Sequence, residues 1–435
     1  MSELLKAPAN AQSPNNSSPQ VIEAVNVIID DVRRNGDEAV RKYSRQFDHW
    51  NPTDFRLSEE QVHNVIKDVP ETVLDDIKFA QKQIREFALR QRESLLDFEV
   101  ETLPGVFLGQ RNIPVNAAGA YVPGGRYPLT ASAHMTVLTA KVAGVERVAA
   151  TTPPVDGSAP PVSVAAMALG GADEIYVLGG VQAIAALSLG TETIDPVNII
   201  TGPGNAFVAE AKRQLFGEVG IDLFAGPTET LVIADESADA LTVAVDLLSQ
   251  AEHGPDSPAV LITTSEKLGR AVIDAIEVLL PDMPTGEIAG TAWHDVGEVH
   301  LVEDLDEAYA LGDRFASEHV QILTENPREA LDKMTNYGAL FLGEGTCVPF
   351  GDKVIGTNHV LPTKGTAKYT GGLWVGKFLK TVSYQEIRDP ESVAKIGEIA
   401  GRLCRVERFE GHARSADLRA KTGNTFPGWV PESLR

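Results

Sequence analysis

One candidate metal-binding pair lies at the end of a predicted helix. The stretch ADALTVAVDLLSQAEH has helical periodicity and ends with Gln250 and His253. Residues spaced three apart share one face of a helix, so an amide oxygen and an imidazole there could hold one metal ion. A helix cap or a surface pair is the more common origin of such a pattern, and the pair alone does not decide between these readings.

A candidate acid/base pair, Glu318 and His319, stands where a predicted helix (AYALGDRFASEH) runs into a predicted strand (VQILTE). Residues at such junctions project into the crevice at a sheet edge. A carboxylate beside an imidazole suits proton transfer near neutral pH. An ordinary pair at a helix end gives the same two letters more often.

Two further segments carry metal-binding or acid/base residue types. GDKVIGTNHVLPT places Asp352 and His359 in a segment rich in Gly, Thr and Lys, over residues 345–372, which we interpret as a long functional loop. VERFEGHARSADLR places Glu407 and His412 five residues apart, near one another if the segment is helical. A turn residue and a solvated helical face are the ordinary alternatives.

Three glycine-rich stretches could bind a dinucleotide. TGPGNAF follows a predicted strand and opens a helix, so its backbone N–H groups could approach a phosphate. LGGVQAIAA and YVPGG have a similar character. None is the GxGxxG fingerprint, and plain tight turns remain the alternative.

The elements around these motifs predict an α/β protein. Helical periodicity runs from Val21 to about Arg92, and GVFLGQRNIPV looks like a strand. From about residue 130, short β-type runs alternate with helices, which favours parallel βαβ units and two open sheets. The segment after Leu373 looks small and helical, so we expect it to pack on something else, such as another subunit.

Composition narrows the class of protein. Acidic residues outnumber basic residues by 61 to 38, giving a formal charge of −23, which argues against a nucleic-acid binder and against a polybasic membrane-surface protein. Two cysteines, Cys347 and Cys404, cannot build a disulfide framework or a thiolate zinc site. With no signal-peptide pattern and no long apolar run, a cytoplasmic location is expected.

Taken together, the motifs resemble the histidinol dehydrogenase family from about Val21 to Arg419. The matching runs are RRNGDEAVRKYSRQFD, YVPGG, GGVQAIAALSLGTE, GPGNAFVAEAKRQ, AGPTETLVIAD, DLLSQAEHGPDS, ASEHVQI, GTNHVLPT and the closing glutamate–histidine pair. The resemblance implies two Rossmann-like open parallel-sheet domains, small helical N- and C-terminal extensions and an intertwined homodimer.

The resemblance also implies domain boundaries. The first Rossmann-like domain is expected over residues 20–120 and 230–372, including a helical N-terminal part. The second, NAD-binding domain is expected over residues 121–229. Residues 1–19 are expected to be a flexible arm, and residues 373–435 a small tail domain that completes the active site of the partner subunit.

Site residues follow from the same resemblance. Zinc is expected to bind Gln250, His253, Asp352 and, from the tail of the partner subunit, His412. Glu318 and His319 match the acid/base pair. NAD contacts are expected at Tyr121, Gln182 and Asn205. The zinc ligands, His319 and Glu407 are also expected to contact substrate.

The implied reaction converts a primary alcohol to an acid with two NAD. His319 is expected to take the hydroxyl proton as hydride leaves, and Glu318 to activate water against the bound aldehyde. No cysteine nucleophile is needed, so Cys347 and Cys404 are interpreted as structural.

The segment after YVPGG departs from the usual family pattern. It reads RYPLTASAHM, which places Arg126 and His134 where small and apolar residues are usual. GPTE in place of GPSE puts Thr228 where the family has a substrate-contacting serine, so Thr228 is expected to contact substrate. Positive charge suits an anionic head group better than the ammonium of histidinol. These departures resemble the sulfopropanediol dehydrogenases, which convert 2,3-dihydroxypropane-1-sulfonate to 3-sulfolactate. Histidinol, another alcohol, or an inactive metabolite-binding homologue are the alternatives, and Arg126 could instead contact NAD or lie at the surface.

Overall fold

The computed structural model describes residues 3–10, 18–124, 129–223, 226–421 and 426–434. These residues divide into two compact units. The larger unit comprises Met1–Arg92 and Pro114–Phe378, and the smaller comprises Glu93–Ile113 and Leu379–Arg435. No helix within the described ranges is both long and apolar enough to cross a membrane.

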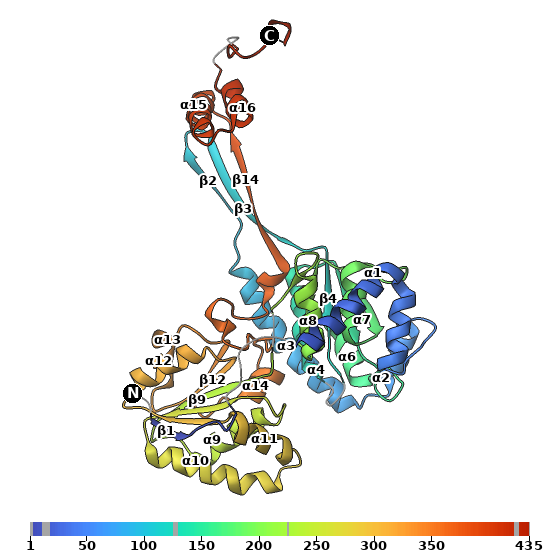
Figure 1. Ribbon diagram of the computed structural model, residues 1–435, viewed down its shortest axis with the longest axis vertical. Helices are drawn as coiled ribbons and strands as arrows, with labels where there is room; N and C mark the ends of the chain where they lie inside the picture. The colour runs from blue at the N-terminus through green and yellow to red at the C-terminus, as the bar shows by residue number, and fades with distance from the viewer. Residues whose placement is uncertain (1–2, 11–17, 125–128, 224–225, 422–425, 435) are drawn as a thin grey trace. The chain divides into compact units, whose positions relative to one another are not determined.

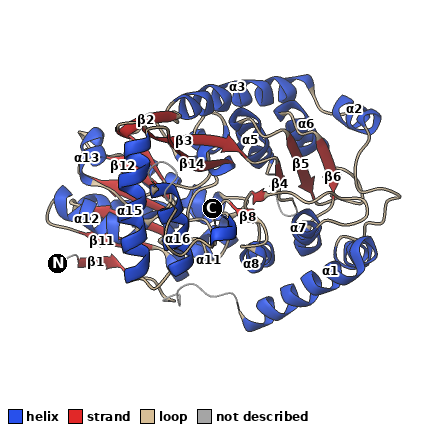
Figure 2. Ribbon diagram, turned by 90° about the horizontal axis from the view of Figure 1, so that it is seen from above, coloured by secondary structure: helices blue, strands red, loops and turns tan. Residues whose placement is uncertain are grey.

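A five-stranded parallel sheet forms one half of the larger unit. Its strand order is β6-β5-β4-β7-β8, so the first strand lies in the middle and the strand order reverses between β4 and β7. Helices α7 and α8 lie on one side of this sheet and α5 and α6 on the other (Figure 2). The elements are β4 (Ala117–Tyr121), α4 (Thr130–Ala133), the π-helical turn η1 (His134–Leu138), α5 (Thr139–Ala143), β5 (Arg147–Thr152), α6 (Pro161–Gly170), β6 (Glu174–Val177), α7 (Gly180–Leu189), β7 (Ile199–Thr201), α8 (Ala206–Leu215) and β8 (Gly220–Ile221).

A six-stranded sheet, ordered β1-β11-β10-β9-β12-β13, repeats this topology with one added antiparallel edge strand, β1. Its central strands are buried on both faces, under α9, α10 and α11 on one side and α12 and α13 on the other (Figure 1). The elements are β1 (Glu3–Lys6), β9 (Thr230–Ala234), α9 (Ala240–Ala251), β10 (Ala259–Thr263), α10 (Glu266–Leu279), η2 (Leu280–Asp282), α11 (Gly286–Val296), β11 (Glu298–Leu301), α12 (Leu305–Phe315), β12 (His319–Leu323), η3 (Pro327–Glu329), α13 (Ala330–Lys333) and β13 (Ala339–Leu342). Two Rossmann-like open sheets are thus confirmed.

The N-terminal residues differ from the expected flexible arm. Strand β1 pairs antiparallel with β11, so it satisfies backbone groups that β11 would otherwise expose at the sheet edge. Leu5 packs against the core of this sheet, and Lys6 donates to the Gly297 carbonyl at 2.5 Å. Residues 11–17 lie outside the described part of the chain.

The N-terminal helices lie on the five-stranded sheet, whereas the sequence assigned them to the other domain. Helix α1 shares a core with α7 and α8, in which Val25 and Val40 accompany Ile184 and Leu187. Apolar periodicity shows that a helix has a buried face but not which sheet covers that face. The three helices are α1 (Pro19–Phe47), α2 (Glu59–Lys67) and α3 (Glu71–Glu93).

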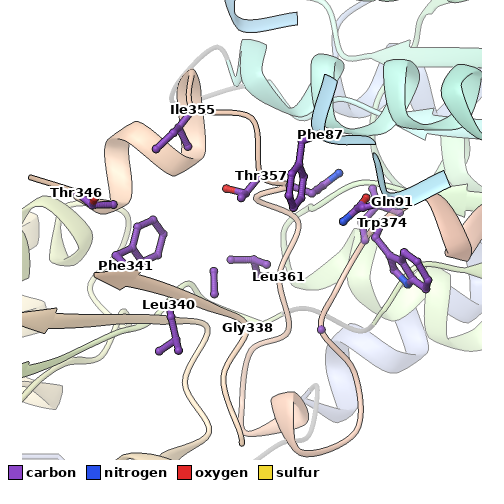
Figure 3. A pocket seen from close by; sticks show the side chains of 14 residues that line it. Phe87, Gln91, Gly338, Leu340, Phe341, Thr346, Ile355, Thr357, Leu361 and Trp374 are labelled. Atoms are coloured by element: carbon purple, nitrogen blue, oxygen red, sulfur yellow. The ribbon is translucent and has the colours of Figure 1, made fainter. Parts of the chain in front are cut away.

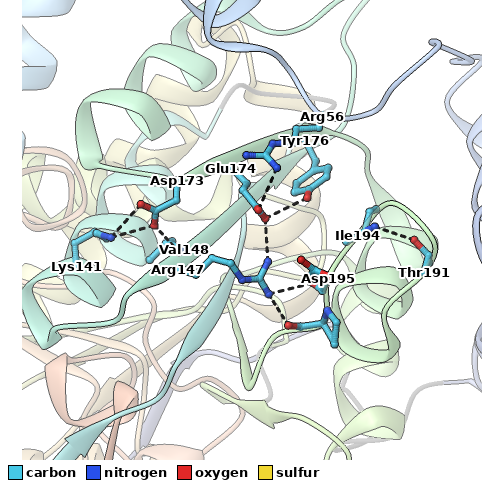
Figure 4. Close-up of polar contacts among 11 residues, drawn as sticks. Arg56, Lys141, Arg147, Val148, Asp173, Glu174, Tyr176, Thr191, Ile194 and Asp195 are labelled. Atoms are coloured by element: carbon cyan, nitrogen blue, oxygen red, sulfur yellow. Dashed lines mark hydrogen bonds and ion pairs between the residues drawn. The ribbon is translucent and has the colours of Figure 1, made fainter.

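Polar contacts also tie the N-terminal segment to this sheet (Figure 4). The Glu174 carboxylate, at the start of β6, is 3.2 Å from Arg56 and 2.9 Å from Arg147. Tyr176 donates its hydroxyl to the same carboxylate at 3.1 Å. An isolated bridge between Arg56 and Tyr176 adds backbone pairing. The segment between α1 and α2 is therefore part of the five-stranded half.

The smaller unit combines a three-stranded sheet with two packed helices. The tail was expected to be helical, but its residues 379–387 form a strand. The sheet order is β14-β3-β2, and the tail joins a segment far away in the sequence. The strand expected at GVFLGQRNIPV is confirmed as β3. The elements are β2 (Phe98–Leu103), β3 (Val106–Pro114), β14 (Leu379–Ile387), α15 (Pro390–Val406), α16 (Glu410–Ala420) and η6 (Glu432–Leu434). The last elements of the larger unit are α14 (Val348–Lys353), η4 (Thr366–Lys368) and η5 (Val375–Phe378). The long loop expected over residues 345–372 therefore contains a short helix, α14.

Candidate active site

The imidazole of His319 is fully enclosed between two carboxylates. His319 begins β12 and is only 2% exposed. Its Nδ1 is 3.1 Å from the Glu229 carbonyl oxygen and 3.5 Å from the Glu318 carboxylate, and its Nε2 is 3.4 Å from Oδ1 of Asp352. Nε2 has no hydrogen-bond partner among the described residues. A buried imidazole nitrogen that has a charged neighbour but no hydrogen bond is available to a substrate hydroxyl.

The two carboxylates control the charge of this imidazole. Burial disfavours the imidazolium, but the negative charges of Glu318 and Asp352 outweigh burial and raise the pKa of His319 to about 10. With no cation bound, His319 is therefore protonated at neutral pH. A divalent cation beside Asp352 would oppose this effect and lower the pKa.

A chain of hydrogen bonds orients the Glu318 carboxylate. Thr228 donates its hydroxyl to Oε2 of Glu318 at 2.5 Å, and the backbone N–H of Glu229 donates to the same oxygen at 3.1 Å. Gln250 in turn donates its amide N–H to the Thr228 hydroxyl. The Oε2 oxygen of Glu318 is thus held by the segment before β9, and Gln250 of α9 supports this contact.

Glu229 is a second buried carboxyl in the site that the sequence did not single out. Burial is the largest cause that raises its pKa to about 7, and the charge of Glu318 is the next. Its Oε1 accepts the Lys364 backbone N–H at 3.0 Å. The only sequence signal for it was its place in GPTE, next to Thr228.

The acid/base pair lies at the amino edge of the six-stranded sheet, not at the carboxyl edge where open α/β sheets usually bind ligands. His319 is the first residue of β12, paired with Thr230, the first residue of β9. A cavity of about 670 Å³ does lie at the carboxyl edge, but carboxylates dominate its lining. They are Asp235, Glu236, Glu303, Asp304 and Glu325. Such a lining repels phosphate, so this half of the protein is unsuited to a dinucleotide there.

Two adjoining cavities surround the pair. One, of about 120 Å³, is lined by Glu318 and His319. The other, of about 330 Å³, is lined by Gln250. His253, Asp352 and Lys353 line both cavities, together with Leu129. The structure therefore brings together the acid/base pair and three of the four expected metal ligands.

The three ligands fit a catalytic cation in the types of their donor atoms. Gln250 uses its amide nitrogen on Thr228, which leaves its carbonyl oxygen for a cation. Partial burial is the largest cause that lowers the pKa of His253, so its imidazole is neutral and able to ligate. No group of three or more His, Cys, Asp or Glu side chains converges as a metal site within the described ranges. The expected set includes a glutamine and a histidine from another chain, so one chain cannot present such a group.

The expected spacing arguments need two corrections. Helix α9 ends at Ala251, so His253 lies beyond the helix, and a turn rather than a shared helical face brings it near Gln250. Glu407 and His412 do not lie in one helix either. Glu407 caps α15, Arg408 has a positive φ of 63°, and His412 lies in α16. Both side chains are exposed and belong to the smaller unit, whereas the residues that line both cavities belong to the larger unit.

Two of the three expected NAD residues lie near one another at the carboxyl edge of the five-stranded sheet. The Tyr121 hydroxyl, at the end of β4, accepts the N–H of Gly180, the first residue of α7, at 3.1 Å. Gln182, in the first turn of α7, donates to Oδ2 of Asp48 at 3.0 Å. Asp48 follows α1 and had no sequence signal, because its role depends on how α1 packs. Asn205 is exposed and caps α8 by accepting two backbone N–H groups.

The loop between β7 and α8 is shaped by a buried ion pair. Lys212 pairs with Asp222 and donates to the Gly202 carbonyl at 2.9 Å, and Asp222 accepts the Gly202 N–H at 2.7 Å. Gly202 has φ +117°, and a Cβ there would collide with the Tyr121 carbonyl oxygen. Glycine is therefore required at the point where the strand order reverses, which is the usual ligand position in such folds.

Of the two residues expected to supply positive charge, the structure describes His134 alone. Arg126 lies outside the described residues. His134 is buried in the π-helical turn, with Nδ1 3.1 Å from the amide nitrogen of Gln81. Burial lowers the pKa of His134 to about 4, so it is neutral, and the expectation that it adds positive charge is wrong. Ser132, two residues before His134, lines the smaller cavity, and its Oγ lies 3.3 Å from Nε2 of His359.

A third, mainly apolar cavity of about 550 Å³ lies between α3, β13 and the segment after α14 (Figure 3). Phe87 and Phe341 lie on opposite sides of it, and Leu361 lines both this cavity and the smaller active-site cavity. Phe341 also contacts the His319 ring, with centroids 5.9 Å apart. It therefore forms part of the wall behind the imidazole.

The fold and the site together define an α/β enzyme with two doubly wound sheets and acid/base machinery. The model of the histidinol dehydrogenase family matches residues 11–420. A histidinol dehydrogenase homolog of Shouchella clausii is 58% identical over 421 residues, which cover 97% of this chain and 99% of that protein. A sulfopropanediol 3-dehydrogenase of Ruegeria pomeroyi is 46% identical over 402 residues, which cover 92% of each chain.

The similarity extends to a solved structure. The crystal structure of histidinol dehydrogenase from Elizabethkingia anophelis has a TM-score of 0.88 to this chain at 33% identity, and the match covers 94% of both chains. The chain belongs to the histidinol dehydrogenase family, whose members are NAD-dependent oxidoreductases that convert an alcohol to an acid. Relatives named for different substrates are similar over nearly the whole chain, so the comparisons establish the family and not the substrate.

Proposed function

We propose that this enzyme oxidises an anionic primary alcohol to the carboxylate, with 2,3-dihydroxypropane-1-sulfonate as substrate and 3-sulfolactate as product. Two NAD and one water are consumed, and two NADH and protons are released. The observation that carries the oxidation is the buried Nε2 of His319, which has no hydrogen bond among the described residues and lies beside two cavities lined by Gln250, His253 and Asp352.

His319 is the base of the first step. Its Nε2 accepts the proton of the substrate hydroxyl as a hydride leaves the carbon that bears this hydroxyl and passes to NAD. Glu229 orients the ring by accepting from Nδ1 through its carbonyl oxygen. Proton acceptance requires a neutral imidazole, so the pKa of His319 in the working enzyme must lie below its value of about 10. Gln250, His253 and Asp352 would hold zinc, which supplies the positive charge that polarises the alcohol oxygen.

Glu318 acts in the second oxidation. Its carboxylate is held by Thr228 and by the Glu229 N–H, and it lines the same small cavity as His319. It takes a proton from the water that adds to the aldehyde carbon. The resulting hydrate is then oxidised by a second NAD, with His319 again accepting the proton. NAD binds at the carboxyl edge of the five-stranded sheet, near Tyr121 and Gln182.

The substrate assignment is supported by the sequence departures after YVPGG and by the similarity to a sulfopropanediol dehydrogenase. Histidinol is the second candidate, because authentic histidinol dehydrogenases share the same fold. An inactive binding protein is disfavoured, since the metal-donor and acid/base residues are all present. A side-by-side measurement of NADH formation from the two alcohols tests the assignment. Efficient turnover of histidinol and none of the sulfonate would reject it.

We further propose that a second copy of this chain completes the site with Glu407 and His412 of its tail. Large apolar side chains are exposed beside these residues in the smaller unit, notably Leu403 at 60%, Val406 at 79% and Phe409 at 55%. Exposed apolar surface of this kind is typical of a subunit interface. Mixing inactive His319→Ala with inactive His412→Ala protein under subunit exchange should restore activity, whereas a fully active monomer would contradict the shared site.

A further inference from the structure

The active-site cavities contain a positive charge that the sequence patterns did not single out. Lys353 is the last residue of α14 and directly follows Asp352. Lys353 is an exposed residue, and it lines both the 120 Å³ cavity with the acid/base pair and the 330 Å³ cavity with Gln250. Among the described residues that line these two cavities, it is the one lysine or arginine.

Lys353 shares these cavity walls with two histidines. His253 lines both cavities, and His359 lines the smaller one. Within the described ranges, no hydrogen bond or ion pair occupies the ammonium itself, so its donors are available to a bound anion.

Of the two residues expected to supply positive charge, Arg126 lies outside the described residues and His134 does not take this place. His134 is neutral and is not among the residues that line either cavity. The nearby carboxylates of Glu318, Asp352 and Glu252 would by themselves repel an anionic substrate. An anionic substrate thus needs a cationic side chain at this wall in addition to any bound metal.

We propose that Lys353 is the specificity-determining residue that binds the anionic head group of the alcohol, an inference that rests on the anionic substrate class proposed above. The reacting carbon lies in the smaller cavity beside His319, and the sulfonate extends past Lys353 toward the larger one. A lysine ammonium is a compact charge with three donors and suits the oxygens of a sulfonate. The same charge disfavours an amino alcohol such as histidinol.

The test replaces Lys353 with Met, which keeps the length and loses the charge, and with Arg, which keeps the charge. For Lys353→Met, KM for the sulfonate diol should rise about 10- to 150-fold, the loss expected for one charge-assisted hydrogen bond. KM for propane-1,2-diol should change little, and Lys353→Arg should retain most of the preference. Lys267→Met, an exposed lysine on α10, is the matched control. Zinc content and melting temperature establish that the variants fold and load.

A second measurement separates this inference from the proposed function. Propane-1-sulfonate cannot be oxidised as an alcohol, so its inhibition constant reports binding whichever alcohol is the substrate. It should inhibit the unmodified enzyme and should inhibit Lys353→Met at least ten times more weakly. Equal inhibition of both proteins, or none of either, overturns the role of Lys353. Turnover of histidinol but not of the sulfonate diol overturns the proposed function, and the inhibition data then still decide the role of Lys353.

Discussion

The Nε2 atom of His319 lies 3.4 Å from Oδ1 of Asp352. The same carboxylate therefore serves two purposes, as a neighbour of the base and as an expected ligand of the metal. Its negative charge, with that of Glu318, keeps the imidazole protonated as long as no cation is present. Metal binding and the protonation state of His319 are thus coupled through the Asp352 side chain.

This coupling predicts how His319 titrates. In metal-free protein, NMR of the imidazole should show a pKa near 10, so His319 carries a proton at every pH well below that value. Addition of zinc should lower this pKa, and Asp352→Asn should lower it without metal, because each removes negative charge beside Nε2. The His319→Gln spectrum assigns the signal. A metal-free pKa close to 6.5 would show that the carboxylates do not control the base.

The hydrogen bond from Thr228 to Glu318 predicts a selective catalytic loss. Thr228→Ala removes a donor from the carboxylate, so oxidation of the aldehyde should slow by about 10- to 150-fold. Alcohol oxidation to the aldehyde should be affected less, because His319 carries that step. Thr228→Ser, the residue usual in the family, keeps the hydroxyl and should behave as the unmodified enzyme. Single-turnover NADH formation from alcohol and from aldehyde checks this, and equal losses would count against the division of labour.

Glu229 predicts a pH dependence of stability. Its pKa is raised to about 7 in the folded protein, so the folded state binds this proton more tightly than the unfolded state. The stabilising contribution is complete below about pH 4.5 and is lost as pH rises through 7, by at most ~3 kcal/mol. Glu229→Gln should remove this part of the pH dependence. Denaturant unfolding of both proteins between pH 5 and 8 measures it, and parallel curves would refute the assignment.

The contact between Gln182 and Asp48 predicts an effect on the dinucleotide. Asp48→Ala leaves the buried Gln182 amide without its acceptor, so it should raise KM for NAD about 5- to 150-fold with a smaller effect on kcat. Glu38→Ala, at an exposed acid of α1, the helix that Asp48 follows, is the control. Unchanged NAD binding in titration calorimetry of Asp48→Ala would place the nucleotide elsewhere.

The sequence by itself determined the fold class and the chemical types of the site residues. Alternating strands and helices predict buried parallel sheets, because each helix carries the chain back to begin a parallel strand and covers a face of the sheet. The family motifs identified Glu318, His319, Gln250, His253 and Asp352 without any geometry. These conclusions depend on local periodicity and on short motifs, and both can be recognised from the order of residues along the chain.

Only the tertiary structure decided which segments meet. Apolar periodicity in α1 predicted a buried face, but packing on α7 and α8 decided that the face belongs to the five-stranded sheet and that Asp48 reaches Gln182. The sequence does not show whether a histidine or a lysine presents a positive charge to a binding site. Burial against Gln81 makes His134 neutral, whereas Lys353 borders two cavities with its charge available. The free energy of a charged group depends on its surroundings, and those surroundings come from parts of the chain that sequence distance does not reveal.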